Sequence, residues 1–340
     1  MKKRRAFITG VTGQDGSYLA EYLAKKGYEV WGLMRYTSLN HLARIRHLVE
    51  SKKLTLLRGN LSDSYSLRLA LEEARPDEVY NLAALSDVAF SKHAPGETMD
   101  VNYLGLKRLI TEAVRVNPSV RIFQASTSEI FKKTRPPQSE KSPLAATNPY
   151  AVAKLKAYRN LVKGYRERRG YFIASGIMFN HESPRRGENF VTRKVTMSLA
   201  RIKLGLLDKF SLGNLDARRD WGFAGDYVKA MHLMLQQKKA DDFVLATGKT
   251  HSIRDLVESA CRELDIPLEW RGQGLEEVGI SNGKVVITID KAFYRPIEAD
   301  EMRGDITKAR RVLHWKPEVS FEKLVGMLAR ADLELLEKSR

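Results

Sequence analysis

Short apolar runs alternate with helix-length amphipathic segments through the first half of the chain. Runs of strand length occupy Ala6–Thr9, Tyr28–Arg35, Leu54–Leu57, Glu78–Asn81, Arg121–Ala125 and Phe172–Met178. Helical patterns occupy Ser17–Lys26, a segment from Ser64, Thr98–Val116 and a segment from Pro149. This alternation predicts an α/β fold with a doubly wound parallel sheet. In such a sheet, ligands bind beyond the carboxyl ends of the strands.

A glycine-rich turn follows the first predicted strand. Gly10, Gly13 and Gly16 are spaced Gly-x2-Gly-x2-Gly, and Gln14 and Asp15 lie between the last two. Glycines let the backbone approach a pyrophosphate closely, and the N-terminus of the next helix offers unpaired N–H groups to it. A tight turn needs glycine even without a ligand, but the strand-turn-helix context favours a dinucleotide. The sequence therefore predicts a Rossmann domain.

Arg35 ends the second predicted strand, where an acidic residue contacts the ribose hydroxyls in many NAD-binding folds. A guanidinium followed by the hydroxyls of Thr37 and Ser38 suits a 2′-phosphate instead. NADP is therefore the predicted cofactor. NAD is the alternative, with Arg35 then a solvated charge at a strand end.

Tyr150 and Lys154 lie four residues apart in a predicted helix and so share one of its faces. A nearby ammonium favours the phenolate, which is a usable base near neutral pH. An ordinary helix can also contain this pair. Thr127 and Glu129 follow another predicted strand, so we expect them beside the glycine turn. Glu129 is either a carboxylate that caps a strand-to-loop turn or a tuned group of a reactive site.

Together these motifs resemble the extended short-chain dehydrogenase/reductase superfamily, and longer segments resemble the GDP-mannose 4,6-dehydratase family. The longer segments are Thr9–Ala20, Gln124–Glu129, Phe179–Lys194, Leu212–Gly222 and Tyr294–Glu298. A segment as long as Phe179–Lys194 is far more specific than a glycine motif. The resemblance implies that GDP-mannose is converted to GDP-4-keto-6-deoxymannose by an internal hydride cycle through bound NADP.

The resemblance also implies a role for each reactive side chain. Tyr150 takes the proton of the sugar 4-hydroxyl, and Lys154 holds the nicotinamide ribose and lowers the pKa of Tyr150. Thr127 hydrogen-bonds the 4-oxygen. Glu129 removes the C5 proton that the 4-ketone has made acidic and then, once protonated, supplies the acid for loss of the 6-hydroxyl. Related dehydratases place Asp before this Glu, where the present chain has Ser128.

Two sets of binding residues follow from the same resemblance. The cofactor set is Gly10, Gly13, Gln14, Asp15, Gly16, Arg35, Asn60, Leu61, Leu82, Ala84, Tyr150 and Lys154. The substrate set is Ser86, Asn180, Val191, Lys194, Arg219, Arg295 and Glu298, with Arg186 or Arg218 as alternative phosphate contacts. The implied domains are an NADP-binding domain of residues 1–178, with return segments at about 220–255, and a smaller C-terminal α/β domain of residues 179–219 and 256–340 that binds the nucleotide sugar.

The chain departs from the usual family pattern near the expected sugar pocket. Leu85 stands where the family usually has glutamine, and Lys132 stands where a glycine follows the aromatic residue. Another GDP-sugar, such as a GDP-heptose, is therefore an alternative substrate. A non-catalytic NADP sensor is a further alternative, although the chain keeps Tyr150, Lys154 and Glu129.

The resemblance predicts a homodimer or homotetramer. Subunits would pair through the helices at Thr98–Val116 and Pro149–Arg168. Tyr36 replaces an arginine that helps to bridge subunits in the family, so tetramer formation is less well supported than dimer formation.

Composition changes this interpretation little. The 340 residues include 58 Lys and Arg against 41 Asp and Glu. The resulting net charge of +17 is compatible with binding to nucleic acid. The basic residues are scattered and no nucleic-acid motif is present, so a nucleic-acid partner is not predicted. The single cysteine, Cys261, suits a reducing cytoplasm. We find no run of membrane length, no signal pattern and no metal-ligand spacing, so a cytoplasmic protein without a membrane partner or a metal is expected.

Overall fold

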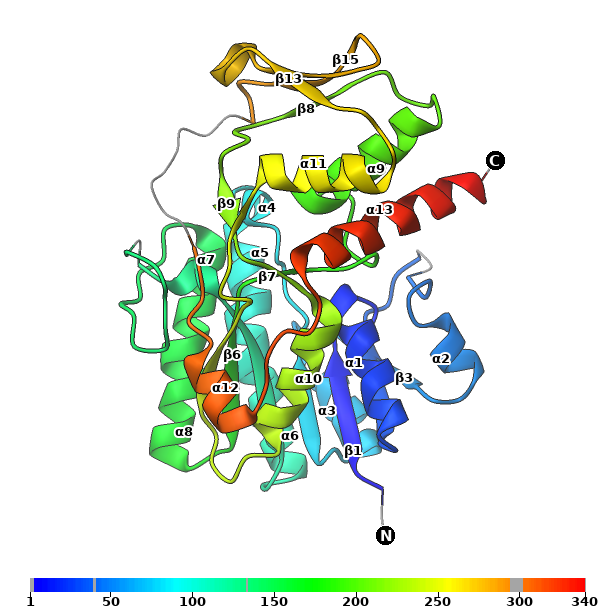
Figure 1. Cartoon of the computed structure of the whole chain (residues 1–340). Coiled ribbons are helices and arrows are strands. Elements are labelled where there is room, and N and C mark those ends of the chain that lie inside the picture. The colour runs from blue at the N-terminus through cyan, green and yellow to red at the C-terminus, as the bar shows by residue number, and fades with distance from the viewer. Residues whose placement is uncertain (1–2, 39–40, 133, 294–301, 340) are drawn as a thin grey trace.

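A seven-stranded parallel sheet forms the centre of the larger lobe in this computed structural model, which describes residues 3–38, 41–132, 134–293 and 302–339 (Figure 1). Its order is β11-β6-β5-β4-β1-β2-β3. The strands are β1 (Arg5–Thr9), β2 (Glu29–Met34), β3 (Thr55–Arg58), β4 (Glu78–Asn81), β5 (Arg121–Thr127), β6 (Ile173–Met178) and β11 (Asp242–Leu245). All six neighbouring pairs are parallel, which requires a crossover between consecutive strands.

Helices cover both faces of this sheet (Figure 1). One face carries α1 (Gln14–Lys25) and α10 (Ala224–Leu235), which pack against each other. The other face carries α3 (Ser64–Ala74), α6 (Gly105–Val116), α7 (Pro149–Lys156) and α8 (Gly164–Arg169). The strand order reverses at β1, between β4 and β2. The predicted doubly wound Rossmann sheet is therefore confirmed.

Both long helices of the second face contain a π-helical turn. The predicted helix Thr98–Val116 consists of α5 (Pro95–Met99), the π turn η1 (Asp100–Leu104) and α6. The π turn η3 (Ala157–Lys163) joins α7 to α8. Asp100 accepts a 2.8 Å hydrogen bond from Arg108, so a side-chain ion pair spans the junction of η1 and α6.

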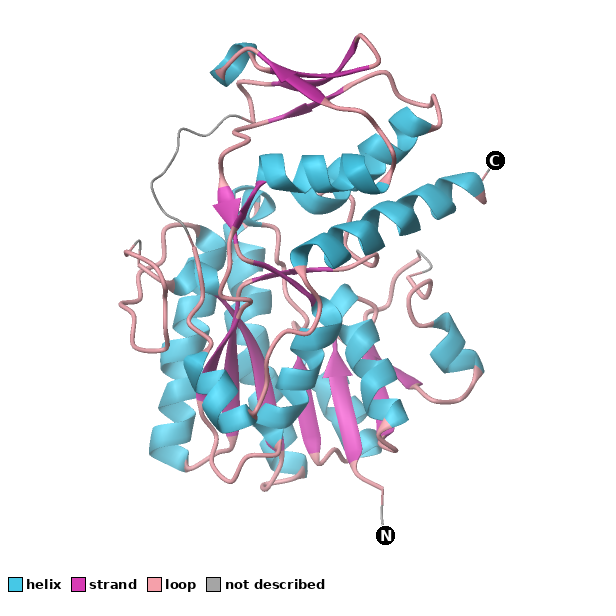
Figure 2. Cartoon of the chain, viewed as in Figure 1, coloured by secondary structure: helices cyan, strands magenta, loops and turns pink. Residues whose placement is uncertain are grey.

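The smaller lobe has its own sheet and core (Figure 2). Its sheet has the order β13-β14-β15-β8. These strands are β13 (Glu269–Arg271), β14 (Val278–Ser281), β15 (Lys284–Ile289) and β8 (Phe210–Leu212). Three helices build the core beneath it: α9 (Val191–Lys203), α11 (Ile253–Glu263) and α13 (Phe321–Glu337). The expected smaller α/β unit is thus present. The short helix α12 (Thr307–Leu313) packs into the core of the larger lobe instead.

A buried ion pair fixes the segment that leads into α9. Arg193 on α9 pairs with Asp332 on α13, and both side chains are buried. The Arg193 guanidinium also donates to the main-chain carbonyls of Pro184 and Arg186. Because a buried charge is costly without partners, these contacts hold the segment before α9 in one conformation.

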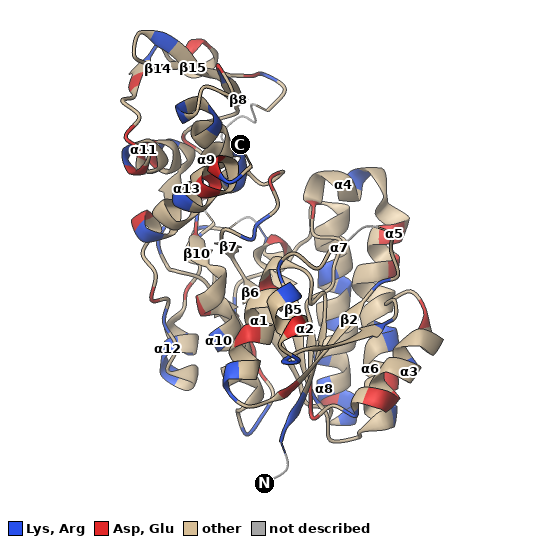
Figure 3. Cartoon of the chain, turned by 90° about the vertical axis from the view of Figure 1, so that its right-hand side faces the viewer, with Lys and Arg blue, Asp and Glu red and all other residues tan. Residues whose placement is uncertain are grey.

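Basic and acidic residues are spread along the ribbon of both lobes (Figure 3). Within the described ranges, no helix combines the length and the apolar character needed to cross a bilayer.

Candidate active site

Buried polar side chains connect the carboxyl ends of three adjacent strands. Thr9 at the end of β1 donates to Asn81 Oδ1 at the end of β4 over 2.6 Å. Asn81 Nδ2 in turn donates to Gln124 Oε1 on β5 over 2.7 Å. The Thr9 hydroxyl also accepts from the main-chain N–H groups of Leu82 and Ala83. This network sets the backbone at the edge where an open parallel sheet binds its ligands.

The glycine turn packs tightly against the segment after β4. Gly10 has φ +68, and a Cβ built on it would lie 2.8 Å from Ala83 N. A Cβ on Gly16 would lie 2.3 Å from Gly10 O. Larger residues are therefore excluded at both positions. Gly13 is the N-cap of α1 and offers no side-chain cap, which leaves the first N–H groups of α1 suited to a pyrophosphate.

The side chains of Gln14 and Asp15 contact the segment after β6. Gln14 Nε2 donates to the His181 carbonyl over 3.0 Å, and Ser183 donates to Gln14 Oε1 over 2.8 Å. Asp15 Oδ2 lies 2.8 Å from His181 Nε2. Cofactor binding by Gln14 and Asp15 stays a prediction, but both residues also join α1 to the strand β7 (Asn180–Glu182).

The contacts of His181 favour its protonated form. Its Nδ1 lies 2.8 Å from the Phe179 carbonyl, an acceptor, so both ring nitrogens face acceptors. Burial alone lowers the pKa of His181, but the charge and hydrogen bond of Asp15 outweigh burial and raise it above 6.5. Burial likewise raises the pKa of Asp15, and His181 then brings it below 3.8. The sequence predicted a structural, hydrogen-bonding histidine here, and these bonds agree with that prediction.

A pocket of about 280 Å³ lies beside the end of β2. Its lining brings together the three residues predicted for the adenosine end of the cofactor, Arg35, Thr37 and Asn60. Thr12, which belongs to the glycine turn, also lines it. Arg35 makes no ion pair with any residue in the described part of the chain, so its guanidinium is available to an anion. Tyr36, also in the lining, is 90% exposed.

Tyr150 and Lys154 lie on α7 with both side chains buried. The Lys154 ammonium is 5.9 Å from the centre of the Tyr150 ring and donates to the Ala125 carbonyl over 2.9 Å. Burial raises the pKa of Tyr150 to about 12, although the Thr127 hydroxyl lowers it. Burial also lowers the pKa of Lys154 to about 8. The sequence predicted a lowered pKa for Tyr150, and that prediction was wrong for the chain by itself because desolvation outweighs the favourable contacts.

Thr127 and Glu129 lie where β5 runs into the 3-10 turn η2 (Ser128–Ile130). The Glu129 N–H donates to Thr127 Oγ1 over 3.2 Å. The charges of both Glu129 and Asp15 act on the pKa of Tyr150. The structure thus brings the predicted reactive residues together beside the glycine turn.

Asn148 is a site residue that sequence reasoning missed. It is the N-cap of α7, and its Nδ2 lies 3.2 Å from Glu129 Oε2. The available signal was an asparagine directly before Pro149 at the start of a helix, which is typical of an N-cap. Nothing in that signal identifies Glu129 as the second partner.

The predicted substrate residues come from several elements. Asn180 begins β7, Val191 and Lys194 lie in the first turn of α9, and Ser86 precedes α4 (Val88–His93). Arg219 lies on β9 (Arg218–Arg219). Arg295 and Glu298 lie outside the described residues.

Three basic side chains on or near these elements differ in the groups that they contact. The Lys194 ammonium lies 4.1 Å from the centre of the Phe293 ring, and burial lowers the pKa of Lys194. Arg186 stacks on Phe190, and its charge lowers the pKa of Tyr150. Arg218 instead donates to the Thr250 carbonyl over 2.8 Å.

In the described residues, we find no group of three or more His, Cys, Asp and Glu side chains placed to hold a metal ion.

Comparisons with known proteins add independent information. A family model described as GDP-mannose 4,6 dehydratase matches residues 7–328. GDP-mannose 4,6 dehydratase 1 of Arabidopsis thaliana is 48% identical over 349 residues, which cover 99% of this chain and 92% of that protein. GDP-mannose 4,6 dehydratase of Homo sapiens is 48% identical and covers 97% of this chain and 92% of its own length. The solved structure of RMD from Pseudomonas aeruginosa with NADPH has a TM-score of 0.79 at 23% identity, over 98% of this chain and 100% of that one. This last similarity supports the fold alone.

Proposed function

The chain belongs to the GDP-mannose 4,6-dehydratase family, which confirms the resemblance inferred from its sequence. From that premise we propose that it converts GDP-mannose to GDP-4-keto-6-deoxymannose and water, with NADP as its cofactor. One observation carries the proposal beyond the family match. Thr127, Glu129, Tyr150 and Lys154 gather at the carboxyl end of β5, beside the glycine turn.

The residues present fit a dinucleotide. The glycine turn excludes side chains at Gly10 and Gly16 and presents the N-terminus of α1 to a pyrophosphate. Arg35 and Asn60 would hold the adenosine end, and Lys154 the nicotinamide ribose. When bound, NADP supplies hydride acceptance from C4 and hydride return to C6, so the reaction has no net redox change. NADP is favoured over NAD because the guanidinium of Arg35 suits a 2′-phosphate.

Tyr150 would move the proton of the sugar 4-hydroxyl. Its phenol must lose a proton first, and burial opposes this. The Thr127 hydroxyl and the positive charge of Arg186 both favour the phenolate. The Lys154 ammonium lies 5.9 Å from the centre of the Tyr150 ring and donates to the Ala125 carbonyl.

Glu129 would act as the base at C5 and then as the acid at the 6-hydroxyl. Its side chain is exposed at the turn after β5, so a sugar bound at the sheet edge can reach it. Asn148 holds Oε2, and no residue of the described ranges donates to Oε1. We therefore assign proton acceptance to Oε1.

We propose that the larger lobe binds NADP and the smaller lobe binds the GDP-sugar. The buried apolar residues form two clusters that match this division, with residues 306–315 contributing to the first. A cytoplasmic location is the matching proposal for a chain whose single cysteine, Cys261, is buried and unpaired.

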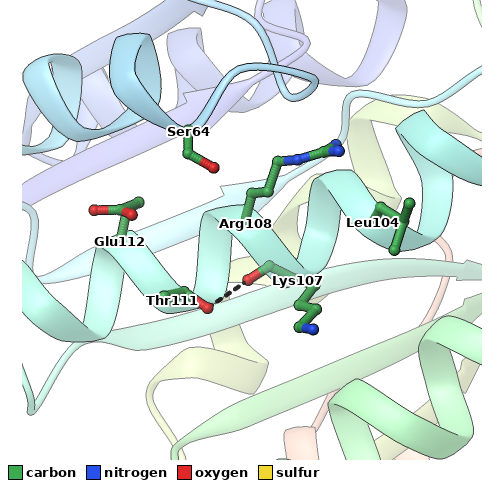
Figure 4. A pocket seen from close by; sticks show the side chains of 6 residues that line it. All are labelled: Ser64, Leu104, Lys107, Arg108, Thr111 and Glu112. Carbon is green, nitrogen blue, oxygen red and sulfur yellow. Dashed lines mark hydrogen bonds between the residues drawn. The ribbon is translucent and has the colours of Figure 1, made fainter.

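We also propose that two subunits pair through α6 and α7–α8. A surface pocket of about 320 Å³ lies along η1 and α6 beside the start of α3, and Leu104, Lys107 and Ser64 are among the residues that line it (Figure 4). Leu104 is 37% exposed there. A partner helix would cover this leucine. Light scattering that finds only monomer, with and without saturating NADP, would reject the pairing.

The decisive test is mass spectrometry of the purified chain with GDP-mannose, trace NADP and no reductant. We expect a product lighter by one water without net NADPH. Tyr150→Phe should abolish turnover and leave NADP binding nearly intact, and Glu129→Gln should stop dehydration. Turnover of a GDP-heptose but not of GDP-mannose would establish the alternative substrate. Binding of NADP without turnover of either sugar would favour the non-catalytic sensor.

A further inference from the structure

We propose that Asn148 is a positioning residue for Glu129, so that one side chain fixes both the start of the Tyr150 helix and the carboxylate that acts on C5. This inference rests on the proposed function of Glu129. Asn148 touches the reactive carboxylate but takes no proton in the steps proposed above.

Both ends of the Asn148 side-chain amide make a hydrogen bond. Its Oδ1 accepts from the Ala151 N–H over 2.8 Å, and its Nδ2 donates to Glu129 Oε2 over 3.2 Å. The orientation of the amide is unambiguous, because a main-chain N–H can only donate and a carboxylate can only accept. Reversing the amide would place donor against donor and acceptor against acceptor.

The helix determines where the Asn148 donor points. Asn148 has extended backbone angles, φ −142 and ψ 161, and its carbonyl accepts from the Val152 N–H over 2.9 Å. Pro149 occupies the first helical position and adds rigidity there. With the backbone and Oδ1 both fixed, the Nδ2 donor keeps a fixed direction toward Glu129. The position of the Glu129 carboxylate is thereby tied to the same helix that carries Tyr150.

The contact also assigns the two carboxylate oxygens. Oε1 would take the C5 proton as the C5–H bond breaks and its electron pair enters the enolate of the 4-ketone. The Oε1–H bond would then give its proton to the 6-hydroxyl as the C6–O bond breaks, which leaves water and a C5=C6 double bond. Nδ2 can stay bonded to Oε2 in both steps, so Glu129 need not move between them.

Other good N-cap residues differ in what they offer Glu129. Aspartate caps a helix as well as asparagine does, but it has no donor and places a negative charge beside the carboxylate. Glycine costs the helix only a few tenths of a kcal/mol as an N-cap and offers no side chain at all. Serine has one hydroxyl that can accept from the helix and donate to a carboxylate. These three substitutions therefore separate capping from positioning.

The experiment compares Asn148→Gly, Asn148→Asp and Asn148→Ser in the purified chain with NADP and GDP-mannose. We expect kcat to fall about 3- to 10-fold in Asn148→Gly with KM nearly unchanged, since a bond to an ionised group is lost. Asn148→Ser should recover part of that loss. In Asn148→Asp the acid limb of the pH profile of kcat should move to higher pH, because a second negative charge beside a carboxylate favours its protonated form.

Ser320→Ala provides the matched control, since it removes the N-cap of α13, where Ser320 accepts from the Lys323 N–H over 3.3 Å. It should lower the melting temperature without moving the pH profile. If Asn148→Asp and Asn148→Gly keep the kcat and pH profile of the parent chain, Asn148 only caps the helix and the inference is overturned. If Asn148→Asp does not fold, Asn148→Gly decides. Failure of the parent chain to dehydrate GDP-mannose would instead reject the proposed function.

Discussion

Asn189 Nδ2 donates a 3.0 Å hydrogen bond to Asp87 Oδ2, and this bond joins the segment before α9 to the start of α4. The other carboxylate oxygen of Asp87 accepts from the N–H groups of Ala89 and Phe90 and so caps α4. Ser86, one of the residues predicted to bind the sugar, directly precedes Asp87. The two lobes are therefore linked next to the proposed sugar pocket.

We expect Asn189→Ala to raise the KM for GDP-mannose about 2- to 5-fold, the range that one exposed hydrogen bond supports, with little change in kcat. Initial-rate kinetics measure this. Asp87→Ser is the companion variant, because serine keeps a cap on α4 but has no carboxylate for Asn189 to bond. An unchanged KM in both variants would show that this link plays no part in binding the sugar.

Lys154→Met should stabilise the protein while it removes activity. Burial lowers the pKa of Lys154 from 10.5 to about 8. At about pH 7 the side chain is charged in both the folded and the unfolded protein, and burial makes that charge unfavourable in the folded protein. Removing the charge should raise the unfolding free energy by up to about 3 kcal/mol. The Ala125 carbonyl would keep a partner, since Gln124 Nε2 also donates to it.

Thermal denaturation without added NADP tests this prediction, with Lys156→Met as the control, because Lys156 is an exposed lysine on the same helix. The lowered pKa of Lys154 also predicts how the stability of the protein changes with pH. Because the folded pKa of Lys154 lies below the unfolded value, the stability of the parent chain relative to Lys154→Met should rise between about pH 8 and pH 10.5. A lower melting temperature for Lys154→Met at neutral pH would contradict the argument.

The sequence alone predicted most of the fold because its signals are local. Alternating apolar runs predict strands, and Gly10, Gly13 and Gly16 mark the turn after β1 whatever the rest of the chain does. The π-helical turns η1 and η3 were not predicted, since a one-residue shift in helical hydrogen bonding leaves the apolar periodicity nearly unchanged.

Contacts between distant segments and the effects of burial on pKa values could not be predicted from local sequence signals. His181 and Asp15 are 166 residues apart in the chain, and neither residue type implies the other. The raised pKa of Tyr150 depends on how completely the fold removes its phenol from water, which a spacing of four residues to Lys154 does not disclose. Asn148 was identifiable as a helix cap but not as a partner of Glu129.

The Asp15–His181 pair should stabilise the protein over a limited pH range. The folded pKa of His181 is raised above 6.5, so its contribution is complete below about pH 6.5 and is lost as pH rises through the folded value. The folded pKa of Asp15 is lowered below 3.8, so its contribution is complete above about pH 4 and is lost as pH falls through the folded value. The two ranges overlap between about pH 4 and pH 6.5.

The melting temperature of His181→Gln, measured against pH without added NADP, tests this overlap. The deficit relative to the parent chain should be greatest between about pH 4 and pH 6.5 and should shrink as pH rises through the folded pKa of His181. His314→Gln is the control, because His314 is an exposed histidine at the end of α12. A deficit that stays constant over the whole range would mean that His181 contributes packing on Tyr227 and not charge.

Arg35 should decide the choice between NADP and NAD. It lines the pocket of about 280 Å³ with Thr37 and Asn60, and no acidic side chain in the described ranges neutralises it there. If the 2′-phosphate lies in this pocket, Arg35→Ala should weaken NADP binding about 10- to 100-fold and change NAD binding little, because only NADP carries the group that the guanidinium bonds. Calorimetric titration with each cofactor measures both affinities, and Arg46→Ala on α2 (Arg46–Glu50) is the control for loss of one exposed arginine. Equal weakening of both cofactors would mean that Arg35 supports the shape of the pocket and does not bind the phosphate. In that case Arg35 would no longer favour NADP, and NAD would become the better-supported cofactor.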